Sequence, residues 1–472
     1  MRHFDLCVIG SGPAGQKAAI QAAKLGKSVC VVEKRQVVGG VAINTGTIPS
    51  KALREAILRS NGHGRTATPT IGDFFAARNV LFTTLLGSCQ EVIKAEIDLV
   101  RGHFASNGIE ILPGKGEFRD ANTVDAIGEH ASTTITADKI LIGVGTNPSR
   151  PSSIPFDTKT IISSDELLTL PYLPRSMIVV GGGVIGTEYA SMLQALGVKV
   201  TLIEGRGRLL DFVDAELTEA LQYHMRTNGM TLRLGEKVVS IKPIEPPKGA
   251  RPGNETIVEA VLESGKSIRA DCLMYCVGRQ GATDGLNLAA AGVAADPRGR
   301  ILVNASYQTN VPNIYAAGDV IGFPALASTS MEQGRLAACH MFGNPYESVA
   351  ELLPYGIYAI PEISMVGWTE EKLTSEGIPY EAGIAQYKEI ARGQLLGDDI
   401  GMLKMLIHQE THTLLGVHII GTGATELVHI GQTAIAFKAT VEHFVNTVFN
   451  YPTLAECYKV AAFNGLNKLR SV

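Results

Sequence analysis

The stretch Gly10-Ser11-Gly12-Pro13-Ala14-Gly15 follows an apolar strand pattern over residues 4–9 and precedes an alanine-rich helix pattern over residues 16–25. A second apolar strand pattern, residues 28–32, ends in Glu33. A glycine-rich loop between a strand and a helix, with an acidic residue about 20 positions further on, is typical of a βαβ unit that binds a dinucleotide. The sequence therefore predicts a Rossmann-like domain at its N-terminus.

The residues of this loop have separate geometric tasks. Gly10 makes the tight turn, Gly12 lets a pyrophosphate approach the backbone, and Gly15 lets the helix pack closely on the strand. The amides of the first helical turn, which includes Pro13 and Ala14, then face the phosphates. We expect the acidic residue at the end of the second strand to bond a ribose hydroxyl.

The same pattern returns 171 residues later in the chain. Residues 177–180 form a strand pattern, Gly181-Gly182-Gly183-Val184-Ile185-Gly186 forms the loop, and residues 199–203 form a strand that ends in Glu204. The offset needs no gap and aligns these pairs: Gly10 with Gly181, Gly12 with Gly183, Gly15 with Gly186, and Glu33 with Glu204. One glycine loop is weak evidence because such loops occur by chance, whereas two in one frame predict two bound dinucleotides.

Composition and length exclude several classes of protein. The 472 residues, with 45% hydrophobic and 19% charged side chains, indicate a soluble globular protein of two to four domains. A net charge of −4 argues against a nucleic-acid partner. No apolar run approaches the roughly 18 residues of a membrane span, and the first residues lead straight into a strand, so no membrane segment or secretory signal is expected.

The cysteine and histidine patterns indicate neither disulfides nor a metal. An odd count of seven scattered cysteines favours free thiols in a reducing cytoplasm. Glu426 and His429 resemble half of a di-metal carboxylate site, but the sequence holds no second such pair. We therefore expect a cytoplasmic protein without a metal centre.

Segments far from the first loop would grip its nucleotide, which favours a tightly held FAD. Gly39-Gly40 would approach the diphosphate or ribitol. Asp319 ends a strand at the sheet edge where ligands bind, so it would bond a ribitol hydroxyl or, alternatively, cap the helix from Ala325. That helix, residues 325–341, would aim its positive end at the flavin ring. The candidate FAD-binding residues are Gly10, Gly12, Pro13, Ala14, Gly15, Glu33, Lys34, Arg35, Gly39, Gly40, Gly116, Thr146, Asp319 and Ala327.

Together these residues resemble the FAD-dependent pyridine nucleotide–disulfide oxidoreductases. The resemblance covers essentially the whole chain and includes the dimerisation signature over residues 360–370. It implies an α/β protein with two Rossmann-like dinucleotide-binding domains and a C-terminal α+β interface domain. The implied domains are an FAD domain in two parts, residues 1–150 and 277–346, an NAD(P) domain, 151–276, and an interface domain, 347–472. A homodimer or higher homo-oligomer is implied as well.

The chain departs from this family at its redox centre. The family motif reads G-G-x-C-x4-C-x-P-S-K, and here Ala42 and Thr47 replace both cysteines while the rest of the frame is intact. The family's C-terminal histidine, which serves those thiols, is Tyr451, although its acidic partner Glu456 remains. A base without a thiol has no proton to move. We therefore expect no dithiol chemistry.

Two residues of the flavin side are retained. Lys51 and Glu188 match the family's ion pair beside the flavin N5, where an ammonium stabilises arriving negative charge. The subfamily most closely resembled is the soluble pyridine nucleotide transhydrogenases. It implies the reaction NADPH + NAD+ ⇌ NADP+ + NADH, run in ping-pong order at one nucleotide site. The alternatives are an NADH-specific diaphorase or quinone reductase and a non-catalytic flavin-binding subunit.

The second loop would bind the nicotinamide nucleotide. Glu204 favours a ribose 2′-hydroxyl and repels a 2′-phosphate. Arg206 and Arg208 would clamp a 2′-phosphate if they swing in, or else are solvated loop arginines. The candidate NAD(P)-binding residues are Gly181, Gly183, Val184, Ile185, Gly186, Glu204, Arg206 and Gly278.

Overall fold

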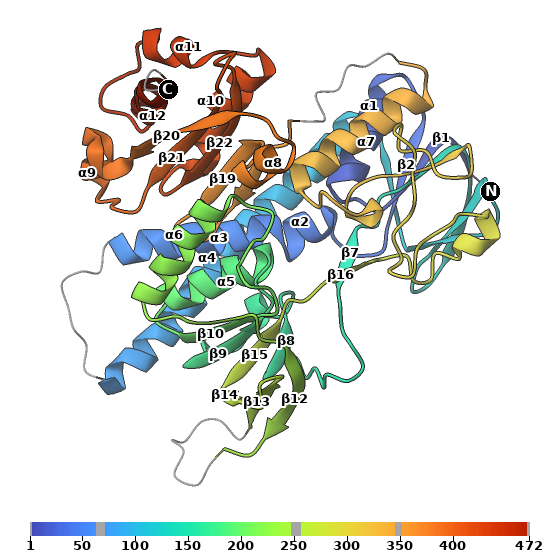
Figure 1. Cartoon of the computed structure of the whole chain (residues 1–472). Coiled ribbons are helices and arrows are strands. Elements are labelled where there is room, and N and C mark those ends of the chain that lie inside the picture. Colours follow the sequence, from blue (N-terminus) through green and yellow to red (C-terminus); the bar gives the residue numbers. More distant parts are fainter. Residues whose placement is uncertain (1, 63–70, 247–255, 345–351, 470–472) are drawn as a thin grey trace. The chain divides into compact units, whose positions relative to one another are not determined.

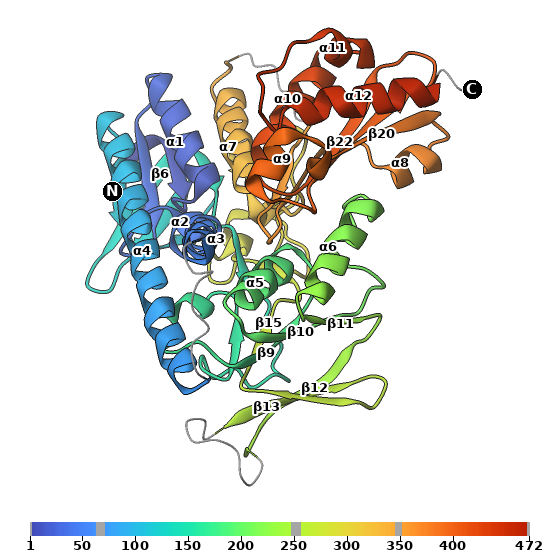
Figure 2. The same cartoon turned by 90° about the vertical axis from the view of Figure 1, so that its left-hand side faces the viewer.

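The computed structural model describes residues 2–62, 71–246, 256–344 and 352–469. The chain forms two compact units, each assembled from two separate stretches: unit 1 is Met1–Ser149 with Gly278–Ser348, and unit 2 is Arg150–Val277 with Val349–Val472. The sequence colours of Figures 1 and 2 trace both units. Each contains helices and sheets, so the predicted α/β class is confirmed. The expected start of the interface domain, residue 347, lies outside the described residues.

Unit 1 is built on a seven-stranded sheet in the order β3-β2-β1-β6-β5-β4, with β17 also paired to β6. Strands β3, β2, β1, β6 and β17 run parallel to one another, whereas β5 pairs antiparallel with β6 and β4 pairs antiparallel with β5. The strands are β1 (Arg2–Ile9), β2 (Val29–Glu33), β3 (Glu110–Pro113), β4 (Lys115–Phe118), β5 (Thr123–Ile127), β6 (Ser132–Ile142) and β17 (Ile314–Ala316). A separate two-stranded ribbon joins β7 (Thr146–Pro148) to β16 (Arg279–Gly281).

Both faces of this sheet are buried, as expected for parallel strands. On β1, Leu6 and Val8 face the helices while Cys7 and Ile9 face the edge strands and the segment around Ile301. The helices are α1 (Pro13–Lys24), α2 (Gly40–Asn44), α3 (Thr47–Gly62), α4 (Ile71–Ser106) and α7 (Ala327–Met341), with short 3₁₀ turns η2 (Leu288–Ala291) and η3 (Asp319–Ile321). Helices α1 and α7 lie side by side (Figures 1 and 2), so close that a Cβ on Gly334 would lie 2.0 Å from the carbonyl oxygen of Ala14.

Unit 2 begins with a five-stranded parallel sheet in the order β11-β10-β9-β15-β8. Its helices α5 and α6 lie on one face (Figures 1 and 2), and an antiparallel three-stranded sheet, β12-β13-β14, packs on the other through Val258 and Ala260. The elements are β8 (Ile161–Ser163), η1 (Leu167–Thr169), β9 (Ser176–Val180), α5 (Val184–Ala195), β10 (Lys199–Glu204), α6 (Ala215–Thr227), β11 (Thr231–Leu234), β12 (Val238–Ile244), β13 (Ile257–Leu262), β14 (Ser267–Ala270) and β15 (Cys272–Tyr275).

The C-terminal part of unit 2 is an antiparallel five-stranded sheet in the order β18-β19-β22-β21-β20. Helices α10 and α12 cover it through Val428, Tyr458 and Ala461, among others. The elements are β18 (Tyr355–Ile357), β19 (Ile363–Gly367), α8 (Glu370–Ser375), β20 (Tyr380–Gln386), η4 (Tyr387–Glu389), α9 (Ala391–Leu396), β21 (Met402–His408), β22 (Leu414–Ile420), α10 (Ala424–Ala436), α11 (Val441–Asn446) and α12 (Glu456–Leu469). Among the helices that the structure describes, none has both the length and the apolar content needed to cross a membrane.

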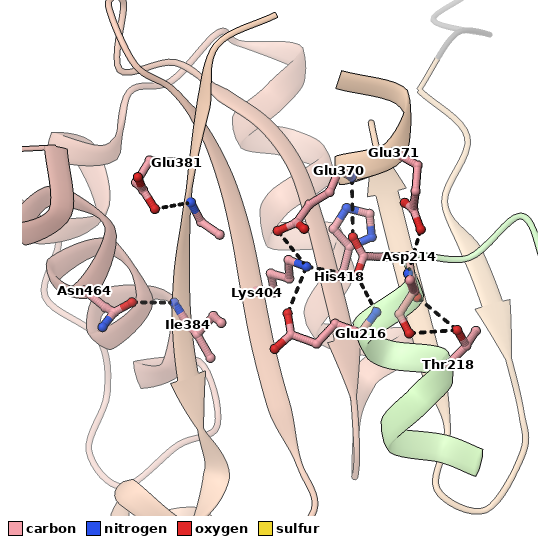
Figure 3. Close-up of polar contacts among 12 residues, drawn as sticks. Asp214, Glu216, Thr218, Glu370, Glu371, Glu381, Ile384, Lys404, His418 and Asn464 are labelled. Carbon is pink, nitrogen blue, oxygen red and sulfur yellow. Dashed lines mark hydrogen bonds and ion pairs between the residues drawn. The ribbon is translucent and has the colours of Figure 1, made fainter. Parts of the chain in front are cut away.

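A buried lysine joins the two parts of unit 2 (Figure 3). Lys404 on β21 has a side chain that is only 1% exposed, and its ammonium contacts Asp214 at 3.0 Å, Glu216 at 2.9 Å and Glu370 at 2.9 Å. Asp214 also caps helix α6 by accepting from the amide of Glu216. Burial alone would lower the pKa of Lys404, but the hydrogen bond that it donates to Glu370 and the charge of Asp214 raise that pKa above its ordinary value. The lysine is therefore charged, and it ties α6 to the C-terminal sheet.

Replacing this lysine should destabilise unit 2. Lys404→Met leaves the buried Asp214 without its cation, so we expect a loss of about 3–5 kcal/mol in the free energy of unfolding. The matched control is Lys372→Met, which breaks an exposed ion pair with Glu376 and should cost about 0.5 kcal/mol or less. Denaturant unfolding of both variants measures the difference. Equal losses would show that the buried cluster contributes no more than a surface pair.

Candidate nucleotide-binding sites

The first glycine loop in unit 1 is closed by contacts that only glycine permits. Gly10 has φ 104°, and its amide donates to the carbonyl of Val32 at 2.9 Å. A Cβ on Gly10 would lie 2.5 Å from the carbonyl oxygen of Gly143, and one on Gly15 would lie 2.0 Å from that of Gly10. Helix α1 therefore starts directly on the end of β1, with its first amides at the carboxyl edge of the sheet.

The second loop, in unit 2, has the same geometry. Gly181 has φ 109°, its amide donates to Ile203 at 2.8 Å, and a Cβ on Gly186 would lie 1.9 Å from the carbonyl oxygen of Gly181. A Cβ on Gly183, in contrast, would meet no atom within 4 Å. Neither its backbone angle nor packing within the protein requires a glycine at this position. A glycine here fits a place where a ligand approaches the backbone closely.

Each acidic residue at the end of the second strand is held by its own loop. Glu33 accepts from the amide of Ser11 at 3.0 Å and from the amide of Arg35 at 2.9 Å. Glu204 accepts from the amides of Gly182 at 2.6 Å and Arg206 at 2.8 Å. The donors correspond between the repeats, because Ser11 and Gly182 are 171 residues apart, and so are Arg35 and Arg206. The two carboxylates are buried, 5% and 7% exposed, and lie at equivalent places on the two sheets.

The second site differs from the first in its arginines. The Arg206 guanidinium donates to both oxygens of Glu204, at 2.9 and 3.2 Å, and it also pairs with Asp211. Burial would raise the pKa of Glu204, but the hydrogen bonds from the Arg206 side chain and from the two amides lower it overall. Arg208 pairs with Glu371 at 2.9 Å. Both arginines are partly exposed and carry ion pairs within unit 2, and the choice between a 2′-phosphate clamp and solvated loop arginines stays a prediction.

Two further glycine segments lie against the first loop. Gly39 has φ 106°, and its amide donates to the Ser11 hydroxyl at 3.0 Å. A Cβ on Gly40 would lie 2.7 Å from the Cα of Gly12, and one on Gly116 would lie 2.7 Å from the side chain of Ile9. Residues 40–44 form the short helix α2, which the sequence did not predict. These contacts bring the predicted segments together around the loop.

Asp319 lies just beyond β17, at the carboxyl edge of the same sheet. Burial raises its pKa, although Arg279, Ser330 and Thr146 act in the opposite direction. Helix α7 starts at Ala327, with Leu326 as its N-cap and no side-chain capping bond, so the alternative that Asp319 caps this helix is wrong. The carboxyl group instead accepts from the Ser330 hydroxyl at 3.4 Å.

Arg279 is a residue of this site that the sequence did not reveal. Its guanidinium donates to the hydroxyl of Thr146 at 2.7 Å and to the carbonyl of Thr146 at 2.9 Å. It follows Gly278, which was expected to bind NAD(P) and which belongs to unit 1 together with Arg279. An arginine next to a glycine was the only signal available, and it is too common to indicate a site.

Comparison with known proteins identifies the family. Residues 4–334 match the family model described as pyridine nucleotide-disulphide oxidoreductase, and residues 353–462 match its dimerisation domain. The chain belongs to this family. The family expected from the sequence is thus confirmed.

Relatives of the family match the chain over its full length. A protein of Mycobacterium tuberculosis named soluble pyridine nucleotide transhydrogenase is 50% identical and covers 100% of this chain and 99% of its own. A protein of the same name from Marinomonas sp. is 44% identical and covers 99% of both chains. Among solved structures, the HOCl-induced flavoprotein disulfide reductase RclA from Escherichia coli is 26% identical, with a TM-score of 0.84 over 96% of this chain and 98% of that one. LpdA from Mycobacterium tuberculosis, 23% identical with a TM-score of 0.86 over 98% of this chain and 99% of that one, shares the fold.

At the two positions where the family has cysteines, this chain has no thiol. Ala42 lies half-buried on α2, and Thr47 is the exposed first residue of α3. Between them, the hydroxyl of Thr45 is buried and has no hydrogen-bond partner among the described residues. One turn into α3, the Lys51 ammonium donates to the Ser50 hydroxyl at 3.3 Å.

The remaining predicted residues lie in unit 2. Glu188, on the first turns of α5, is buried and accepts from the amide of Tyr358 at 2.8 Å. Tyr451 is 75% exposed, and Oε2 of Glu456 is buried without a hydrogen-bond partner in the part of the chain that the structure describes. Lys51 and Glu188 belong to different units, and their pairing stays a prediction.

Two glycines of the second loop should respond differently to an added methyl group. Gly186→Ala forces a Cβ against the Gly181 carbonyl, so we expect it to cost about 3 kcal/mol of unfolding free energy. Gly183→Ala has room for its methyl group and should unfold like the native protein, yet bind NAD+ more weakly. Thermal unfolding and NAD+ titration of both variants test this. Normal NAD+ binding by Gly183→Ala would contradict the assignment of this loop as the nucleotide site.

Proposed function

We propose that the protein transfers hydride between nicotinamide nucleotides, NADPH + NAD+ ⇌ NADP+ + NADH, with FAD held by unit 1 and the nicotinamide nucleotides held in turn by unit 2. The observation that carries the proposal is the retention of two complete dinucleotide loops in a chain without the family's thiol pair. The two full-length relatives named soluble pyridine nucleotide transhydrogenase support it.

The residues of unit 1 fit a resident dinucleotide. Gly12 and Gly40 carry no side chain, so the loop offers backbone atoms to a diphosphate. The first amides of α1 would donate to that diphosphate, and the buried Glu33 would accept from a ribose hydroxyl. Asp319 stands at the carboxyl edge of the same sheet, where a sugar or ribitol hydroxyl is bonded in such folds. Several separate segments converge on this loop, which suits a cofactor that stays bound.

The residues of unit 2 fit an exchangeable nucleotide of either kind. Glu204 presents carboxylate oxygens to a ribose hydroxyl, and Arg206 beside it is the cation that a 2′-phosphate requires. The open position at Gly183 leaves room for a diphosphate. A single site that accepts both nucleotides in succession accounts for the ping-pong order.

The absence of cysteine at positions 42 and 47 determines where the electrons go. Bound FAD supplies a ring that accepts hydride from one nicotinamide and returns it to another. Without a thiol pair beside the ring, this chain has no dithiol to pass the electrons on to. We propose that the Lys51 ammonium pairs with Glu188 and stabilises negative charge at the flavin edge.

Two half-reactions test the proposal directly. The purified flavoprotein is reduced with NADPH without oxygen, excess nucleotide is removed, and NAD+ is added. We expect the yellow absorbance to bleach and then to return. A flavin that stays reduced would contradict transhydrogenation, and reduction by NADH alone with fast turnover of quinones would indicate a diaphorase. A flavin that neither nucleotide reduces would indicate a non-catalytic subunit.

Lys51 should affect hydride transfer rather than cofactor binding. Lys51→Met removes the ammonium and keeps an unbranched side chain of similar shape up to Cε, so flavin reduction by NADPH should slow by about 100-fold, equivalent to roughly 2.7 kcal/mol of transition-state stabilisation. The FAD content should stay that of the native protein. Lys94→Met, which changes an exposed lysine on α4 of the same unit, is the control. Stopped-flow traces that match the native protein would show that Lys51 has only a structural role.

We further propose a cytoplasmic homodimer. All seven cysteines are free, which suits a reducing compartment. The match to a dimerisation domain supports self-association, and it covers the exposed Val448 and Tyr451. Light scattering at increasing protein concentration measures the oligomer directly.

A further inference from the structure

Two carboxylates share the guanidinium of Arg206. Glu204, only 8% exposed at its side chain, accepts from Nε and Nη2, while Asp211, 47% exposed, pairs with Nη1. The Arg206 side chain itself is 46% exposed. The hydrogen bonds that Arg206 donates to Glu204, ahead of the one it donates to Asp211, raise the pKa of Arg206 above its ordinary value. The guanidinium is thus charged and engaged on both sides.

The first repeat lacks this arrangement. The counterpart of Arg206 is Arg35, whose amide donates to Glu33, but no ion pair joins the Arg35 side chain to Glu33 within the described ranges. The counterpart of Asp211 is Gly40, which approaches the loop backbone instead. Asp211 therefore belongs to the one repeat that is proposed to distinguish NAD(H) from NADP(H).

The backbone at Asp211 is held in place by contacts with neighbouring segments. Arg208 donates from Nη2 to the carbonyl of Asp211 at 2.7 Å and from Nη1 to Glu371. Leu210, which directly precedes Asp211, is fully buried, and its amide donates to the carbonyl of Gly182 at 3.1 Å. The loop thus keeps the Asp211 carboxylate beside the acidic residue of the nucleotide site.

A 2′-phosphate at this place meets a specific electrostatic cost. It carries about two negative charges and would lie next to the ionised Glu204, so it requires the Arg206 cation. The cation can turn fully to the phosphate only by leaving Asp211. A 2′-hydroxyl has no such requirement, because it can donate to Glu204 while Arg206 stays where it is.

We propose that Asp211 sets the nucleotide preference of the second site by holding the Arg206 guanidinium back from the 2′-phosphate of NADP(H). This inference rests on the proposed function, in which one site takes both nucleotides. Asp211 is a positioning residue, since it acts through Arg206 and need not touch the nucleotide.

The test measures binding without hydride transfer. The flavoprotein is titrated calorimetrically with ADP-ribose and with its 2′-phosphorylated form, 2′-phospho-ADP-ribose. Asp211→Asn should bind 2′-phospho-ADP-ribose about fivefold more tightly, the size expected for release of an exposed ion pair, and should bind ADP-ribose within about twofold of the native protein. Glu219→Gln, an equal change of charge on the exposed face of α6, should shift neither affinity.

A double-mutant cycle separates release of Arg206 from simple loss of a nearby negative charge. Arg206→Ala should weaken 2′-phospho-ADP-ribose more than ADP-ribose, and adding Asp211→Asn to Arg206→Ala should change neither affinity further. Asp211→Glu, which keeps the negative charge, should keep the native ratio of the affinities for 2′-phospho-ADP-ribose and ADP-ribose. An unchanged ratio in Asp211→Asn would overturn the proposal, and so would an equal gain in the Arg206→Ala background.

Failure of this inference can be told apart from failure of the proposed function. Reduction by NADPH and reoxidation by NAD+ report the function, whereas the two ADP-ribose affinities report the role of Asp211. A protein that transfers hydride but shows no change of ratio in Asp211→Asn refutes only the inference. A protein that transfers no hydride but shows the expected ratio refutes only the function.

Discussion

A missing Cβ at two positions governs both nucleotide units. The carbonyl oxygens of Gly10 and Gly181 occupy the space where a Cβ on Gly15 or Gly186 would stand, at 2.0 and 1.9 Å. Each helix therefore rests directly on its loop, with its first amides level with the end of the strand. The neighbouring carboxylates are held by amides of the same loops. In both units the helix and the loop meet through one close approach that only glycine allows.

These features could be predicted from the sequence because they are local. The glycines and acidic residues are recognised by their spacing along the chain, and the same spacing returns after 171 residues. In the structure, even the amides that donate to Glu33 and Glu204 come from equivalent positions, Arg35 and Arg206. The absence of thiols at Ala42 and Thr47 is equally a matter of reading positions in a motif. The two-unit organisation also follows from the repeat, since each βαβ unit needs its own sheet.

Side-chain partners from distant segments could not be predicted. The sequence places Arg206 near Glu204 but gives no sign that Asp211 competes for it. Arg279 reaches Thr146 across the whole inserted stretch of unit 2, and Lys404 meets carboxylates that lie about 190 residues away in the chain. Such contacts depend on how sheets and helices pack, and residue type alone does not encode them.

The late strand β17 has a consequence for synthesis of the protein. It adds to the free side of β6 at Ile140–Ile142, yet roughly 170 residues separate the two strands, so at about 5–20 residues per second a ribosome needs on the order of 10–35 seconds to deliver it. Until then the nascent sheet keeps an open, apolar edge. Because each unit ends only after the other has begun, neither can be cut out as one continuous fragment that folds by itself. Termination between residues 150 and 348 would leave both units incomplete, whereas termination after Ser348 would spare unit 1 and leave only unit 2 incomplete.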